Sequence, residues 1–215
     1  MASPIPRTSL FTFTVPVRAG DRIVVDGRLN EWTSLHKLPP IALEGERSFA
    51  DVYAAWSTDG MWFAVRVSRS KALRVLPNRL SEGDCLELYI DTRDFRSAHR
   101  AGRYCHKFVV APVGGTGRSN APLFEHLDIQ RAQMTPPHIT AKQVKIAAMV
   151  ASDEYTIELF LPRDVLNGYD VDVTRRMGLA YVLRDTEHGA QTWPHSGDLP
   201  VWSDTSLWAT IELVD

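Results

Sequence analysis

Two tryptophans, Trp193 and Trp202, lie in a polar segment late in the chain, residues 186–206, with the sequence TEHGAQTWPHSGDLPVWSDTS. The Gly, Pro, Ser and Asp residues of this segment predict a loop. Loops of this length are usually either functional or disordered, and two tryptophans favour an ordered one. A flat indole ring suits the apolar face of a sugar ring, while nearby carboxylates and amides can bind the hydroxyls. Loop tryptophans also anchor loops to the body of a domain, so both roles remain open here.

A second set of polar side chains contains donor types that a metal ion accepts. These are His99, Cys105 and His106, with Asp91 and Asp94 nearby in the sequence. Cys105 and His106 are adjacent on a predicted strand and therefore point to opposite faces, so both cannot join one site without a bulge. We expect His106 to be partly buried and hydrogen-bonded. The oxygen-rich stretch Asp91 to Asp94 could hold calcium, although its spacing does not match an EF-hand loop.

Motifs of catalysis are missing from the sequence. It contains no G-x-S-x-G, P-loop or H-E-x-x-H motif, and GGTGRS at residues 114–119 lacks the Lys-Ser/Thr pair of a phosphate-binding loop. Glu87, Asp91 and Glu158 could be proposed as paired carboxylates, but positions along strands do not fix the separation that glycoside hydrolysis requires. We therefore expect a non-catalytic protein.

The composition is that of an ordinary globular domain. The 215 residues are 44% hydrophobic and 23% charged, with a net charge of −2, and we expect one domain over residues 1–215. No basic stripe could follow a nucleic acid, and the arginine-rich stretch Arg93 to Arg103 is interpreted as a solvated hairpin loop. The sequence has no apolar run long enough for a membrane span and no signal-peptide core, so as written it stays where it is made, although its location is unknown.

Two cysteines, Cys85 and Cys105, are equidistant from a loop centred on Phe95. They could lie opposite each other in a hairpin, but two cysteines build no disulfide framework. Without an export signal we expect two reduced thiols in the core.

Alternation of apolar and polar residues predicts strands along most of the chain. In Asp84 to Asp91, Leu86, Leu88 and Ile90 point one way and the intervening residues the other. The predicted strands are 51–56 paired with 61–68, 84–91 paired with 103–110, 144–151 paired with 155–161, then 177–184 and 207–214, with a helical turn at 162–166 and long loops at 112–137 and 186–206. The sequence thus predicts an all-β fold, a two-sheet antiparallel β-sandwich with a jelly-roll-like order. Trp56 and Trp62 are expected in the core, and Trp32 as a plug over one sheet.

Four segments in this order resemble the family 9 carbohydrate-binding modules, whose sandwich is shared with the wider DOMON-like group. They are VDGRLNEW (25–32), DCLELYID (84–91), YTIELFLP (155–162) and PVWSDTSLWATIEL (200–213), and with GLAYVLRD (178–185) they cover nearly the whole chain. The resemblance implies a protein that clasps the end of a sugar chain between two tryptophans and carries structural calcium. Trp202 matches one clasping tryptophan, and Glu87 matches an acidic residue that holds sugar hydroxyls.

The chain also departs from this pattern. The other clasping tryptophan should lie within residues 78–83, which here read NRLSEG without an aromatic residue. On the following strand, Tyr104, His106 and Phe108 take the face where the family places a polar pair. The resemblance therefore implies a modified sugar site, in which Trp193 could replace the missing ring.

Three hypotheses follow. The first is carbohydrate binding at a rim formed by Trp202, Trp193, Glu87, Asp185 and Gln191, with His106 on the neighbouring strand. The second is a sandwich that has lost its sugar site and binds another protein. The third is haem binding, for which Met61, Met149, Met177 and His106 are available ligand types.

Overall fold

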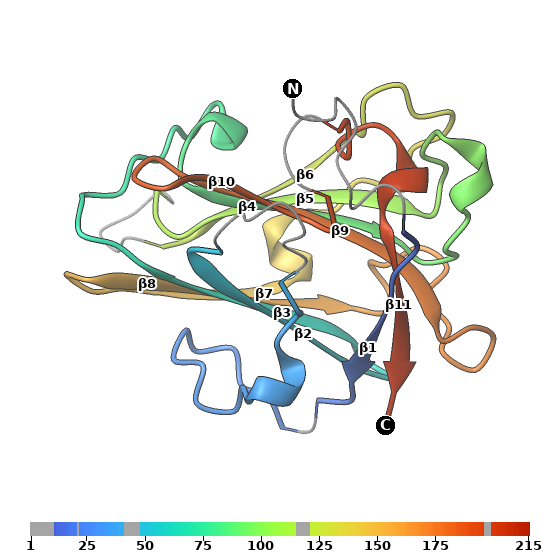
Figure 1. Ribbon diagram of the computed structural model, residues 1–215, viewed down its shortest axis with the longest axis horizontal. Coiled ribbons are helices and arrows are strands. Elements are labelled where there is room, and N and C mark those ends of the chain that lie inside the picture. Colours follow the sequence, from blue (N-terminus) through green and yellow to red (C-terminus); the bar gives the residue numbers. More distant parts are fainter. Residues whose placement is uncertain (1–10, 21, 41–47, 115–120, 196–198) are drawn as a thin grey trace.

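Eleven strands form two stacked sheets in the described part of the chain (Figure 1). The computed structural model describes residues 11–20, 22–40, 48–114, 121–195 and 199–215. The strands are β1 (Thr14–Arg18), β2 (Ala50–Ser57), β3 (Gly60–Ser68), β4 (Cys85–Asp91), β5 (Cys105–Ala111), β6 (Leu123–Leu127), β7 (Lys145–Val150), β8 (Glu154–Pro162), β9 (Arg176–Asp185), β10 (Gly189–Trp193) and β11 (Ala209–Val214). The short 3-10 helices are η2 (Ser34–His36), η3 (Leu80–Glu82), η4 (Arg96–Ala98), η5 (Ala141–Gln143) and η6 (Thr205–Leu207).

The larger sheet has the order β1-β11-β9-β4-β5-β6, and β10 pairs with the part of β9 that β11 leaves free. The smaller sheet has the order β2-β3-β8-β7. The predicted all-β sandwich is confirmed. Its sheets are antiparallel except at one edge, where β1 runs parallel to β11.

The core between the sheets follows from the alternation of side chains along each strand. Leu86, Leu88 and Ile90 of β4 face the smaller sheet and join one cluster with Phe63 and Val65 of β3. The opposite face of β4 is covered as well, because loops lie over Tyr89, and all seven residues of the strand are buried.

The predicted loops contain two strands that the sequence did not reveal. β10 lies within the predicted loop 186–206 and forms a hairpin with β9, in which Gly189 takes a positive φ of 96°. β6 lies within the predicted loop 112–137 and pairs with β5. Both strands are only five residues long, too short for alternation to stand out among the Gly and Pro residues around them.

Other predicted boundaries are close to those observed. The β2–β3 hairpin has Ser57 opposite Gly60, which leaves a two-residue turn. β8 ends at Pro162, as predicted. The predicted helical turn after Pro162 is a hydrogen-bonded turn, in which Val165 N–H donates to the Pro162 carbonyl, and not a helix.

The segment around Trp32 covers the outer face of the smaller sheet, as predicted. Its ring packs on Tyr53 of β2, and its indole N–H donates to Glu158 of β8 at 2.7 Å. The second oxygen of Glu158 accepts from the backbone N–H groups of Asp26 and Gly27. One buried carboxylate thus fixes the plug to the sheet.

The cysteines are free, and both are buried. The strand register corrects the idea that they face each other, since Cys105 lies opposite Asp91, at the far end of β4 from Cys85. Burial raises the pKa of each thiol to about 12, so both are protonated at neutral pH.

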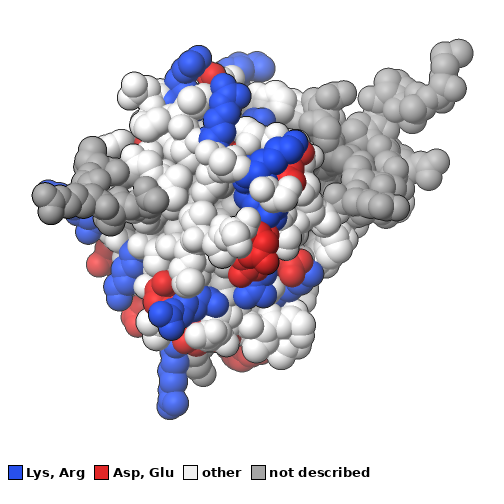
Figure 2. Space-filling model, turned by 90° about the vertical axis from the view of Figure 1, so that its left-hand side faces the viewer, with Lys and Arg blue, Asp and Glu red and all other residues white. Residues whose placement is uncertain are grey.

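Positive and negative side chains are interspersed on the face in Figure 2, where no continuous basic stripe is seen. Within the described residues, no helix has the length and apolar character of a membrane span.

His106 on β5 and His126 on β6 lie side by side with ring centroids 5.5 Å apart. Each ring accepts one backbone hydrogen bond, His106 from Asn167 and His126 from Ile139. The second nitrogen of each ring is buried without a partner among the described residues. Burial therefore lowers the pKa of His106 to about 3 and that of His126 to about 4.

The free energy of unfolding should therefore fall as the pH is lowered from 7 to 5. In the unfolded chain these histidines bind protons below about pH 6.5, whereas in the folded protein they stay neutral. Stability is thus fully present above the unfolded pKa, and each histidine contributes a slope approaching about 1.4 kcal/mol per pH unit below it. Urea denaturation at pH 7, 6 and 5 measures this slope. In His126→Phe the slope should be smaller, and an unchanged slope would contradict the assignment.

Candidate functional site

A groove of about 280 Å³ lies on the outer face of the larger sheet. Most of this face is covered, because Ala101, Ile129, Val201 and Trp208 pack over Tyr89 and its neighbours. The groove remains open beside this cover. It is lined by Ser81, Glu87, Lys107, Asp128, Gln130, Arg184 and Trp202.

Trp202 forms part of the groove wall. It lies in a tight turn closed by hydrogen bonds from Ser203 and Asp204 N–H to the Pro200 carbonyl. Beneath the turn, the buried Trp208 donates its indole N–H to the Val201 carbonyl at 2.7 Å. The Trp202 residue is 38% exposed. Its turn is thus anchored to the sheet while its side chain reaches solvent at the groove.

Glu87 forms the floor of the groove and is only 2% exposed. Its carboxylate accepts from Arg184 Nε at 2.8 Å and from the Tyr89 hydroxyl at 2.6 Å, and Lys107 Nζ lies 3.1 Å away. Burial alone would raise the pKa of Glu87, but Lys107, Tyr89 and Arg184 together hold it below its usual value. The carboxylate is therefore ionised and fixes two cations at the groove.

Lys107 and Arg184 bring hydrogen-bond donors to the floor. Arg184 is bound to Glu87 through Nε, and its side chain is 40% exposed. Lys107 lies over the Tyr89 ring, 5.5 Å from its centroid, and its side chain is 15% exposed. Each cation has more N–H groups than Glu87 occupies. With Asp128 and Gln130 on the wall, the groove can offer donors and acceptors beside an aromatic ring.

Trp193 does not reach this groove. It is 1% exposed, packs against Tyr181 with parallel rings 6.0 Å apart, and donates its indole N–H to the Pro39 carbonyl. The suggestion that it replaces the missing clasping ring needs correction, because no face of the ring is open to a ligand.

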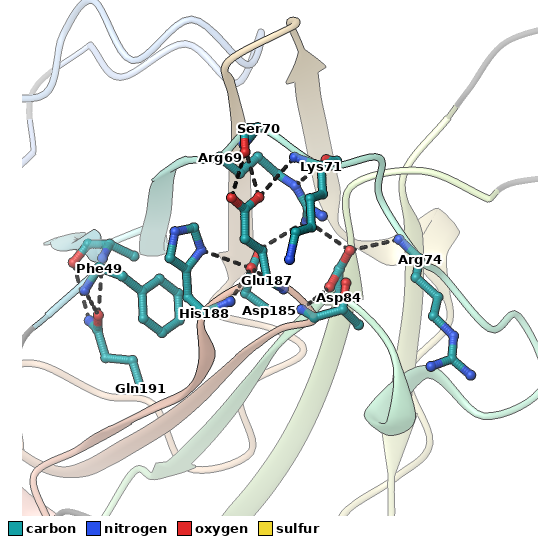
Figure 3. A network of polar contacts seen from close by, with 12 residues as sticks. Phe49, Arg69, Ser70, Lys71, Arg74, Asp84, Asp185, Glu187, His188 and Gln191 are labelled. Carbon is teal, nitrogen blue, oxygen red and sulfur yellow. Dashed lines mark hydrogen bonds and ion pairs between the residues drawn. The ribbon is translucent and has the colours of Figure 1, made fainter.

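Asp185 and Gln191 are engaged in structural contacts away from the groove (Figure 3). The Asp185 side chain is fully buried and forms an ion pair with Arg69. Gln191 accepts from the backbone N–H groups of Phe49 and Ala50 and donates to the Tyr181 hydroxyl. Both residues therefore hold strands together, and their predicted role at the rim is corrected.

His106 is fully buried on the inner side of β5. The register places Tyr89 opposite Lys107 and Ile90 opposite His106, so Lys107, and not His106, shares the face of Glu87. The prediction that His106 lies on the ligand side is therefore wrong by one residue, because the groove residue is Lys107. A lone lysine in the apolar strand YCHKFVV was the available sequence signal for Lys107.

The segment that should carry the second clasping tryptophan forms η3, with Leu80 buried and Ser81 lining the groove. No aromatic side chain is present in residues 78–83. One wall of the groove therefore lacks the ring that the resemblance implies.

The carboxylates considered for catalysis serve other purposes. Glu158 binds the plug segment on the other sheet, and Asp91 accepts from the backbone N–H groups of Arg93 and Phe95. Glu87 is neutralised by two cations. Glu87 shares the groove with Asp128, but its two oxygens already contact Lys107, Arg184 and the Tyr89 hydroxyl.

Three of the four residues considered as haem ligands are buried. Met61, Met177 and His106 are at most 1% exposed, whereas Met149 is exposed on the edge strand β7.

The resemblance implies structural calcium, and the buried acidic pair Asp84 and Asp185 offers carboxylate oxygens for it. Each of their carboxylate oxygens accepts a hydrogen bond from an N–H group, and both carboxylates contact Arg69. Over the described ranges, no group of three His, Cys, Asp or Glu side chains is arranged to hold a metal ion. The residues at this pair, as arranged, do not fit calcium.

Solved structures share this fold at low sequence identity. A family 9 carbohydrate-binding module from Caldicellulosiruptor kristjanssonii, in complex with cellotriose, gives a TM-score of 0.64 at 15% identity over 94% of this chain and 93% of that chain. The structure in complex with glucose gives 0.60 at 15% over 94% and 96%. A candidate carbohydrate-binding protein from Bacteroides uniformis gives 0.60 at 11% over 94% and 99%. No protein-family model and no curated protein sequence matches the chain. The fold is thus like that of family 9 carbohydrate-binding modules, and identities this low establish the fold alone.

Replacing Glu87 with Gln should lower the free energy of unfolding by about 2 kcal/mol, because two cations lose their counter-charge. The loss should be smaller than at a fully buried pair, since the Arg184 side chain is 40% exposed. Urea denaturation measures it. The double variant Glu87→Gln/Lys107→Met should regain part of the loss, and a single variant as stable as the parent would contradict the role of Glu87.

Proposed function

We propose that this protein is a non-catalytic carbohydrate-binding domain whose ligand lies in the groove beside Trp202. The observation that carries the proposal is the position of Trp202 in one groove with Glu87, Lys107 and Arg184. An aromatic face beside fixed donors and acceptors matches the two faces of a sugar, which is apolar over its ring and polar at its rim. The cellotriose and glucose bound by the two structural neighbours support the same class of ligand.

Lys107 and Arg184 are the main donors in this proposal. Glu87 orients them through its own hydrogen bonds, which leaves their remaining N–H groups for ligand oxygens. Glu87 is thus a positioning residue more than a direct acceptor, because Arg184, Lys107 and Tyr89 already occupy its oxygens. Acceptors for sugar hydroxyls are provided by Asp128 and Gln130.

The size of the groove and its single aromatic ring limit the ligand. A volume of about 280 Å³ lies at the lower end of ligand pockets, which suits one or two sugar units. A stacking contact contributes about 1 kcal/mol beyond area burial, so a site with one ring binds more weakly than a two-ring clasp. We therefore expect weak binding of a mono- or disaccharide unit, or of the end of a longer chain.

Trp202→Ala tests the proposal. Calorimetry of the parent protein against glucose, cello-oligosaccharides and a panel of other soluble glycans should reveal a ligand, and the variant should lose at least about tenfold in affinity for it. Phe95→Ala is the matched control, because Phe95 is 64% exposed and does not line the groove. Its affinity should equal that of the parent.

Two results would overturn the proposal. One is the absence of heat with every glycan at millimolar concentration. The other is equal loss of binding in Trp202→Ala and Phe95→Ala. Capture of a defined protein partner without glycan binding would instead support a protein-interaction domain with this fold.

A further inference from the structure

Arg69 lies at the centre of a buried set of oxygen atoms. It follows β3 of the smaller sheet, and its side chain is 4% exposed. Nη1 donates to Asp84 at 2.8 Å and to Asp185 at 2.9 Å. Nε and Nη2 donate to the carbonyl oxygens of Lys71 and Ala72 at 2.8 and 2.9 Å. Two carboxylates and two carbonyls thus converge on one cation (Figure 3). We refer to these four oxygens as the oxygen cage.

The oxygen cage joins the two sheets. Asp84 immediately precedes β4, and Asp185 is the last residue of β9, both in the larger sheet. Both side chains are fully buried. Two buried carboxylates so close together repel each other and require a cation between them. Arg69 supplies it from the smaller sheet.

Glu187 fixes the segment that supplies the carbonyl groups. Its carboxylate accepts from Ser70 N–H, Ser70 hydroxyl and Lys71 N–H at 2.7–2.9 Å. These hydrogen bonds lower the pKa of Glu187 to about 2. The segment after β3 is thereby attached to the β9–β10 hairpin.

Tyr155 of β8 packs beside the Arg69 guanidinium and carries a buried hydroxyl. Its ring lies 5.9 Å from the Arg69 guanidinium carbon, and its hydroxyl is buried without a hydrogen-bond partner among the described residues. Burial raises the pKa of Tyr155, with Asp185 and Asp84 adding to the effect. The hydroxyl is therefore neutral at neutral pH.

The groups around the Arg69 guanidinium could bind a metal ion through oxygen atoms, and the two carboxylates are negatively charged. Ca²⁺ in proteins binds carboxylate and carbonyl oxygens with six to eight ligands, some of them water. We propose that the Arg69 guanidinium takes the place of a calcium ion in the oxygen cage. The inter-sheet contact is then independent of metal, and removal of the guanidinium turns the cage into a calcium site. Because Ca²⁺ requires shorter oxygen distances than a guanidinium, the segment carrying Lys71 and Ala72 must move inward in such a variant.

Thermal unfolding of the whole protein, in EDTA and in about 5 mM Ca²⁺, tests this proposal. This Ca²⁺ concentration is above the dissociation constants of weak calcium sites, which reach about 1 mM. The parent should have the same Tm in both. Arg69→Gln should lose about 10 °C in EDTA, because two buried carboxylates lose their cation, and should regain about half of this loss in Ca²⁺. Arg69→Lys keeps a cation in the cage and is the matched control, whose Tm should not depend on Ca²⁺.

Terbium luminescence reports the position of the metal. Tb³⁺ replaces Ca²⁺ at oxygen sites, and excitation of a nearby tyrosine or tryptophan sensitises its emission. Arg69→Gln should show sensitised emission that Ca²⁺ displaces. The added substitution Asp84→Asn should abolish it. The parent and Arg69→Lys should show neither effect.

A lower Tm of the parent in EDTA than in Ca²⁺ would overturn the proposal, since the stability of the parent would then depend on calcium. An Arg69→Gln protein that responds neither to Ca²⁺ nor to Tb³⁺ would overturn it as well. The same conclusion follows if Arg69→Gln stays unfolded in both solutions while Arg69→Lys folds, because Ca²⁺ then cannot replace the guanidinium.

Discussion

The alternation of side chains in β4, β5 and β9 is the constraint on which the candidate site depends. In these strands one face contributes to the core between the sheets, and the other lies under loops or at the groove. Glu87, Lys107 and Arg184 occupy the second face, while Leu88, Phe108 and Leu183 occupy the first. Since the period is two residues, each position on these strands faces either the core between the sheets or the outer side, where loops and the groove lie.

A buried carboxylate with cationic partners recurs on both faces of the larger sheet. On the outer face, Glu87 holds Lys107 and Arg184 at the groove. On the inner face, Asp84 and Asp185 hold Arg69 from the other sheet. In both places, burying charge is tolerated because the partners are within 3.1 Å and hydrogen bonds occupy the remaining oxygens. The first arrangement presents donors to solvent, and the second joins the layers.

The fold class could be predicted from the sequence because most of its strands are long and show a clear alternation of apolar and polar residues. The stretch DCLELYID shows its inner face directly, and Pro162 marks the end of β8. β1, β6 and β10 were not predicted, because each is only five residues long and carries too little alternation to stand out. The parallel pairing of β1 with β11 also left no local sign in the sequence.

The candidate site was predicted in part. Glu87 and Trp202 share the groove, whereas Trp193, Asp185, Gln191 and His106 do not line it. His106 and Asp185 are each one residue away from a groove residue, Lys107 and Arg184. Propensity identifies a strand but not its register against neighbours, so a polar residue next to the correct position is as plausible as the residue itself. The indole of Trp193 belongs to the inner face because it lies opposite Tyr181 on β9.

The adjacency of Arg184 and Asp185 constrains insertions and deletions in β9. Arg184 contributes to the groove, and the next residue, Asp185, forms the inter-sheet ion pair with Arg69. Insertion or deletion of a single residue in β9 would send the guanidinium into the core and the carboxylate into the groove, disrupting both at once. Homologous proteins with this arrangement should therefore keep the length of β9 fixed and vary in their connecting loops.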